Sequence, residues 1–188
     1  MREPSTGSPT LSPVTSRLQI DLFALALGAL ALLSLAFVEE RNGAALVMSA
    51  LCFAGLLAAR LIGFSSRALV PVAIGLVVIL WLVWIDPVTH PRTMSAIAHA
   101  AGGALVGWAV CDYLRERVAW PDSGLLALAG VFAITVLWEI GEFAGDRLLT
   151  TSLQASETDS ALDIFLGTFG GAAAVALGWL LAPRPRGR

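Results

Sequence analysis

The sequence predicts an all-α protein, a polytopic bundle of six transmembrane helices with both termini in the cytoplasm. Of its 188 residues, 57% are hydrophobic and only 14% are charged, and the mean hydropathy is +0.79. A soluble domain carries about 25% charged residues. Apolar runs of membrane-spanning length fill most of the chain, and in lipid such runs must satisfy their backbone hydrogen bonds as helices.

The six predicted helices are separated by short polar connections. About 17 to 25 apolar residues cross the hydrocarbon core at 1.5 Å each. Charged or turn-forming clusters end the runs, such as the cluster from Glu39 to Gly43 and the one from Asp86 to Arg92. The predicted spans are 20–38, 44–64, 68–85, 94–111, 123–140 and 163–182.

The ends of the chain and the arginines predict the orientation. Residues 1–18, rich in Ser, Thr and Pro, are expected to be a disordered tail. The membrane domain then covers 19–183, and 184–188 form a basic tail. Nine of the twelve arginines fall in the tails and in the second and fourth connections. The positive-inside rule therefore places both termini in the cytoplasm of a multi-pass protein of the cytoplasmic (inner) membrane.

The net charge excludes one class of partner, and the cysteine spacing argues against a cysteine metal site. The net charge of −2 argues against a nucleic-acid partner, which needs clustered positive surface. The lipid bilayer is the expected surrounding. Cys52 and Cys111 are far apart and lack metal-ligand spacing, so we expect buried free thiols.

The stretch from Trp138 to Asp163 gathers six of the fourteen acidic residues between two apolar runs. An ionisable group inside a membrane segment costs ~2.5 to 3.5 kcal/mol on insertion scales, so it is usually turned inward, paired or functional. Glu139, Glu142 and Asp146 follow the i, i+3, i+7 pattern and share a face if the helix continues outward. Asp159 and Asp163 are four positions apart and share a face in the same way.

His99 is the expected partner of this stretch. It lies five residues into its predicted helix, roughly 7 Å below the outer boundary. Glu139 lies ~24 Å above the inner start of its own helix in a core ~30 Å thick, which is a similar depth. Asp163 opens the last predicted helix one level above them. We therefore predict a polar site near the outer leaflet, with these candidate catalytic residues: His99, Glu139, Glu142 and Asp163.

Carboxylates with an imidazole suit a divalent metal ion and equally suit acid/base chemistry. Each residue also has a structural interpretation. Asp163 can cap its helix, because Ser160 and Asp163 have capping-box spacing. His99 can bond a neighbouring helix, Asp86 and His90 are expected to be loop residues outside the site, and Glu142, Asp146, Glu157 and Asp159 can be solvated loop charges. The candidate metal ligands are His99, Glu139, Glu142, Asp146, Asp159 and Asp163.

Glycines predict which helices touch. Gly103 and Gly107 on the fourth helix, and Gly167 and Gly171 on the sixth, have the spacing that permits close helix packing. Contact between these helices would bring His99 within reach of Asp163. The alternative is that these glycine-rich faces join two copies into a homo-oligomer.

Three motifs stand out in the second half of the chain. They are His99-x-x-x-Gly103, Trp138-Glu139-x-x-Glu142-Phe143, and Asp159-x-x-x-Asp163 with Gly167-Thr168-x-Gly170. With these motifs the chain resembles, over 97–178, the YjdF-like small polytopic inner-membrane proteins, relatives of the VanZ-like group. Ser95 and Ala96 stand where VanZ-like proteins usually carry an Asp-Lys pair, and Glu142 stands where they tend to carry Gln, which favours the YjdF-like branch. The resemblance implies a six-helix membrane protein and gives weight to the polar residues, but implies no reaction and no cofactor.

Three functions compete at this point. The first is a site, enzymatic or ligand-binding, that opens to the outer leaflet and takes a lipid-linked or envelope molecule. The second is a structural or assembly role in which the carboxylates tie helix ends together. The third is a small proton-coupled transporter. The sequence contains no HExxH, GxSxG or phosphate-binding glycine loop that would select a reaction.

Overall fold

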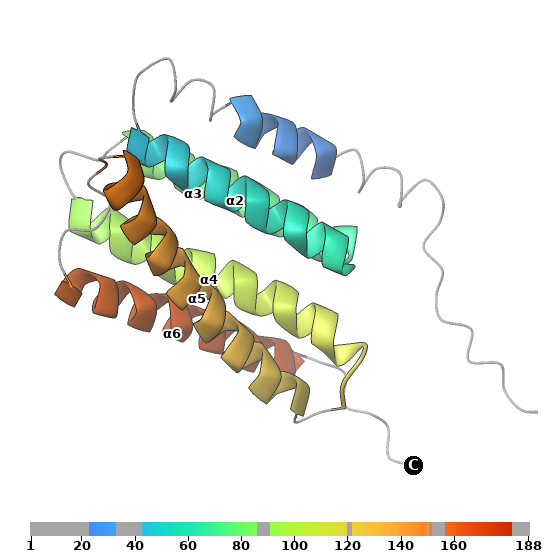
Figure 1. The fold of residues 1–188 in the computed structure, drawn as a ribbon. Helices are drawn as coiled ribbons and strands as arrows, with labels where there is room; N and C mark the ends of the chain where they lie inside the picture. Colours follow the sequence, from blue (N-terminus) through green and yellow to red (C-terminus); the bar gives the residue numbers. More distant parts are fainter. Residues whose placement is uncertain are drawn as a thin grey trace, which may run out of the picture.

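The computed structural model describes residues 23–32, 43–85, 91–119, 122–149, 151 and 157–181. These residues form six helices, as predicted, and Figure 1 shows their arrangement. The predicted tails, 1–18 and 184–188, and the connection that holds Asp86 and His90 lie outside the described residues. The helices are a short one, Phe23–Leu32, followed by α2 (Gly43–Ile62), α3 (Ser66–Ile85), α4 (Pro91–Arg115), α5 (Asp122–Leu149) and α6 (Glu157–Leu181).

Four of these helices are long and apolar enough to cross a membrane: α2, α4, α5 and α6. The other two apolar segments, Phe23–Leu32 and Ser66–Leu82, are shorter within the described residues. Large hydrophobic side chains such as Leu125, Leu137 and Phe169 are exposed on the bundle surface, where lipid would cover them. The structure thus confirms an all-helical fold over the described residues and is consistent with a multi-pass membrane protein, while six spans and the side of the termini stay predictions.

α4 is the central helix of the bundle. It contacts α3, α5 and α6, and its contact with α6 is the most extensive in the molecule. α2 and α3 lie side by side on one flank, with the short helix Phe23–Leu32 beyond them (Figure 1). Phe23 and Leu30 of that helix are buried in the same apolar cluster as Leu56 of α2 and Leu69 of α3.

The predicted glycine contact between α4 and α6 is confirmed. Gly103 meets Gly167 so closely that a β-carbon at position 103 would collide with the carbonyl group of Gly167. Gly107 and Gly171 repeat this contact one helical turn further along. The two helices therefore touch backbone to backbone, as small residues allow. The same contact occupies these glycine faces within one chain, so they are not free to join a second copy.

The helices around the acidic stretch are longer than hydropathy predicts. α5 continues past Ile140 to Leu149, and α6 begins at Glu157 rather than at Asp163. The end of an apolar run marks the boundary of the membrane's hydrocarbon core, whereas a helix ends where its backbone hydrogen bonds end. Asp163 is therefore an interior residue of α6, and the interpretation of Ser160 and Asp163 as a capping box is wrong.

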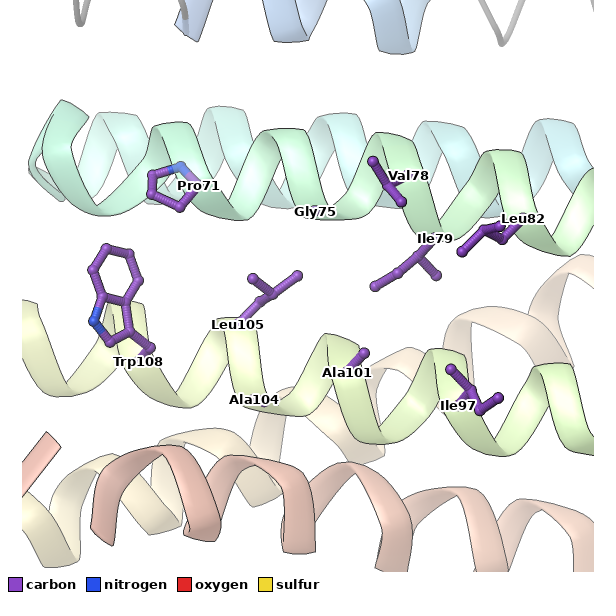
Figure 2. A pocket seen from close by; sticks show the side chains of 10 residues that line it. All are labelled: Pro71, Gly75, Val78, Ile79, Leu82, Ile97, Ala101, Ala104, Leu105 and Trp108. Carbon is purple, nitrogen blue, oxygen red and sulfur yellow. The ribbon is translucent and has the colours of Figure 1, made fainter. Parts of the chain in front are cut away.

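An apolar groove of about 620 Å³ lies between α3 and α4. Figure 2 shows the side chains of Leu105 and Trp108 on α4 directed toward α3. Small residues at Gly75, Ala101 and Ala104 leave the space open. No polar residue of the predicted site lines this groove, so the groove and the site are separate features.

A second polar cluster fastens the opposite end of α4. The buried Asp112 bonds Arg115 and accepts a hydrogen bond from Ser65 Oγ at 3.4 Å. The Ser65 hydroxyl in turn accepts the backbone N–H of Ala68 in the first turn of α3. The cluster thus joins the start of α3 to the end of α4, at the end opposite His99. Both cysteines, Cys52 and Cys111, are buried free thiols, as predicted.

Candidate functional site

His99 lies between two carboxylates that come from two other helices. Its Nε2 is 3.2 Å from Glu139 Oε1 on α5, and its Nδ1 is 3.2 Å from Asp163 Oδ1 on α6. The exposed fractions of the three side chains are 10% for His99, 5% for Glu139 and 8% for Asp163. The predicted convergence of these three residues is therefore observed, in a place that excludes most water.

The α4–α6 contact positions two of the three residues. His99 stands four positions before Gly103, and Asp163 stands four positions before Gly167, so each lies on the glycine face of its own helix. Because the glycines hold the backbones together, the side chains one turn outward meet as well. The close packing thus places the imidazole and the carboxylate within contact distance.

α5 supplies the third residue from a buried polar row. Thr135, Glu139 and Glu142 are spaced i, i+4, i+7 and are all buried. A β-carbon at Gly167 would meet the Thr135 side chain, which shows that this row faces α6. An apolar helix that turns its polar residues inward satisfies them with neighbouring helices instead of lipid.

Ser95 is a member of the site that sequence reasoning missed. Its hydroxyl donates to Asp163 Oδ2 at 3.2 Å, and its backbone carbonyl oxygen lies 3.0 Å from His99 Nδ1. Ser95 precedes His99 by one helical turn on α4, so the i−4 spacing was the available signal. In the sequence it stood out only as a departure from VanZ-like proteins.

The predicted candidates divide between this centre and its surroundings. Glu142 is a buried residue of α5, so its interpretation as a loop charge is wrong. It accepts a hydrogen bond from Trp138 Nε1 at 2.7 Å and interacts electrostatically with the other three residues. Asp146, one turn beyond Glu142 toward the C-terminal end of α5, accepts a hydrogen bond from Thr151 Oγ1 at 2.5 Å.

Two further acidic residues lie on α6, before Asp163. Asp159 is half-buried one turn before Asp163, within the helix rather than in a loop. Glu157 begins α6, and its side chain lies outside the described residues. Asp146 and Asp159 thus lie on the same helices as Glu139 and Asp163, but they are not in the group of three residues whose ligand atoms lie within 4.8 Å of one another.

The three central residues have the composition and spacing of a metal centre. His99, Glu139 and Asp163 each offer one ligand atom, and these atoms lie within 4.8 Å of one another. Ligand atoms bound at about 2.1 Å to one tetrahedral ion are about 3.4 Å apart. The observed separation of 3.2 Å between His99 Nε2 and Glu139 Oε1 is close to this value.

The electrostatics of the site call for a positive charge or for protons. Three carboxylates, those of Glu139, Glu142 and Asp163, are buried around one imidazole. The arginines at the ends of α4 and α5 that are nearest to the site, Arg92 and Arg147, are exposed, and Arg147 lies over the Phe143 ring. Buried carboxylates are stable only when a positive charge or a proton accompanies them. A metal ion bound at the centre would supply that charge.

Comparison of this chain with protein-family models, with curated proteins and with solved structures finds no match. The functional argument therefore depends on the geometry of the site.

Proposed function

We propose that this protein is a multi-pass protein of the cytoplasmic membrane whose centre of His99, Glu139 and Asp163 binds a divalent metal ion. The observation that carries the proposal is the convergence of three ligand atoms, from three helices, within 4.8 Å of one another. Nitrogen and carboxylate oxygen together suit zinc and other first-row divalent ions.

The proposed topology has six spans, with both termini in the cytoplasm and the metal centre near the outer leaflet. The distribution of arginines supports this orientation, because nine of twelve fall on the side of the termini. His99 then lies about two helical turns inward of Pro91, the outer end of α4. We also propose kinship with the YjdF-like proteins, supported by the motifs around His99, Glu139 and Asp163.

A metal ion at this depth could act on a molecule that approaches from the outer leaflet. It would polarise a carbonyl or phosphoryl oxygen as a Lewis acid, or hold such a group in place. The proposed ligand class is therefore a lipid-linked or envelope molecule with an oxygen-rich group next to its lipid anchor. Support for this class comes from the burial of the centre within membrane-spanning helices.

Metal content of the purified protein tests the proposal. We expect about one zinc or comparable ion per chain in the wild type, and loss of that ion in Glu139→Gln. Glu116→Gln is the matched control, because Glu116 is exposed at the opposite end of α4. Equal metal content in Glu139→Gln and the wild type, or none in the wild type, would overturn the proposal.

A structural role is the second candidate, and the bridging position of His99 favours it. An imidazolium between Glu139 and Asp163 would tie α4, α5 and α6 together without a metal ion. This role predicts that the wild type is metal-free and that substituting His99 lowers stability only. Proton-coupled transport has less support, since the three carboxylates gather near one end of the helices instead of lining a path.

A further inference from the structure

We infer that the two nitrogens of His99 have different roles in the proposed metal centre. In this assignment Nε2 binds the metal ion together with Glu139, while Asp163 and Ser95 hold the ring through Nδ1. The inference rests on the proposed function. It narrows the protein ligands to His99 and Glu139, so that Asp163, whose oxygen is one of the three converging ligand atoms, becomes a positioning residue together with Ser95.

The surroundings of Nδ1 assign the ring proton to that nitrogen. The backbone carbonyl oxygen of Ser95 lies 3.0 Å away and the Asp163 carboxylate oxygen Oδ1 lies 3.2 Å away, and both accept hydrogen bonds. The Ser95 hydroxyl lies 3.3 Å from Nδ1, but it donates its own proton to Asp163 Oδ2. A nitrogen that faces two acceptors is the donor of the neutral ring. The lone pair of Nδ1 is then absent, so Nδ1 cannot bind metal.

The carboxylate of Asp163 is in turn oriented by Ser95. The Ser95 hydroxyl donates to Asp163 Oδ2 at 3.2 Å and lies 3.4 Å from Oδ1. The carboxylate is thus fixed between the hydroxyl of Ser95 and the ring of His99. Oriented carboxylates of this kind set the tautomer and ring angle of metal-binding histidines in many metal sites.

Nε2 is the nitrogen left to bind a ligand. It is shielded from solvent and makes no hydrogen bond within the described part of the chain, although Glu139 Oε1 lies 3.2 Å away. A lone pair beside a carboxylate oxygen is repulsive unless a proton, as in the structural alternative, or a metal ion lies between them. Because the distance between His99 Nε2 and Glu139 Oε1 is close to that between two ligand atoms of one ion, a metal ion at this position would bind both atoms.

Glu142 adds a further carboxylate near the ring of His99. Its carboxylate is fixed by Trp138 Nε1, and it interacts electrostatically with His99 and Glu139. It lies outside the group of three that shares the 4.8 Å spacing. Its role in this assignment is to add negative charge that favours a divalent over a monovalent cation.

Cobalt(II) titration of the purified full-length protein in detergent separates ligands from positioning residues. Cobalt gives visible absorption bands whose position and intensity depend on the atoms bound to it. We expect Glu139→Gln to lose or alter the bands. In Asp163→Asn and Ser95→Ala the bands should keep their shape, while the dissociation constant rises about 10- to 100-fold for loss of an outer-shell partner.

Each outcome decides a separate claim. Absence of cobalt binding in the wild type would overturn the proposed function and this inference with it. Bands altered by Asp163→Asn in the same way as by Glu139→Gln would make Asp163 a ligand and overturn only the division of roles. If Asp163→Asn fails to fold, the variants Ser95→Ala and Ser95→Thr test the division of roles instead. Weaker binding with unchanged bands in Ser95→Ala, restored in Ser95→Thr, supports the assignment, and unchanged affinity in Ser95→Ala overturns it.

Discussion

His99 Nδ1 lies 3.2 Å from Asp163 Oδ1, and each of these residues stands four positions before a glycine of the α4–α6 contact. The polar pair and the two glycine pairs therefore form one continuous row on each helix. The distance between imidazole and carboxylate depends on how closely the two backbones approach. Stability of the bundle and geometry of the site are consequently linked.

Gly103→Ala should separate α4 from α6 and weaken the centre. The new methyl group would collide with the Gly167 carbonyl, which belongs to the backbone and cannot turn away. Overpacking of this kind costs about 1 to 3 kcal/mol, so the melting temperature and the metal content should both fall. Gly102→Ala is the control, because a β-carbon there meets nothing within 4 Å. Equal effects of the two substitutions would contradict the link between packing and site.

Removing His99 alone should destabilise the protein more than removing the whole centre. In His99→Leu the carboxylates of Glu139 and Asp163 lose the imidazole between them while still buried, at a cost of up to about 3 to 5 kcal/mol. The triple variant His99→Leu, Glu139→Leu, Asp163→Leu should recover much of this loss, because an apolar cluster needs no counter-charge. Thermal unfolding in detergent measures both variants. A triple variant less stable than the single one would show that polar contacts themselves hold the helices.

Divalent metal should raise the thermal stability of the wild type. A ligand that binds only the folded state stabilises it by about 2.7 kcal/mol at a concentration 100 times its dissociation constant. Treatment with a chelator should therefore lower the melting temperature, and added zinc should restore it. Glu139→Gln should respond to neither treatment. A chelator effect of the same size in this variant would place the metal elsewhere.

Cysteine labelling tests the proposed orientation. Cys52 and Cys111 are buried and should not react, so a new exposed cysteine reports its own side of the membrane. Leu148 is exposed near the outer end of α5, and Glu116 is exposed beyond the last turn of α4. A membrane-impermeant maleimide added to intact cells should label Leu148→Cys and spare Glu116→Cys. The reverse labelling pattern would show that the orientation in the membrane is opposite to the proposed one.

Much of the fold and the central pair of residues could be predicted from the sequence. Apolar runs located the helices, because only helices satisfy backbone groups in lipid. The spacing of Gly103 with Gly107 and of Gly167 with Gly171 predicted the contact of α4 with α6. The rise per residue placed His99 and Glu139 at one depth, and the structure brings them within 3.2 Å of each other.

The outer ends of α5 and α6 and the role of Ser95 could not be predicted in the same way. Hydropathy ends with the apolar run, so it gave no reason to extend the helix through Glu142 or to begin α6 before Asp163. Ser95 carries no charge, and its importance arises from Asp163 on a neighbouring helix. Such a contact depends on the rotation of two helices about their axes, which residue spacing along one helix does not determine.

The glycine row also restricts how this chain can diverge. Any side chain at position 103 would push the α4 and α6 backbones apart and draw His99 away from Asp163, and a side chain at position 167 would collide with Thr135 of α5. Descendants of this gene that keep the centre must therefore keep both glycines, while the exposed faces of the same helices can exchange one apolar residue for another. A lineage that lost the three polar residues would be released from this restriction. The glycines and the polar residues are thus expected to be retained or lost together.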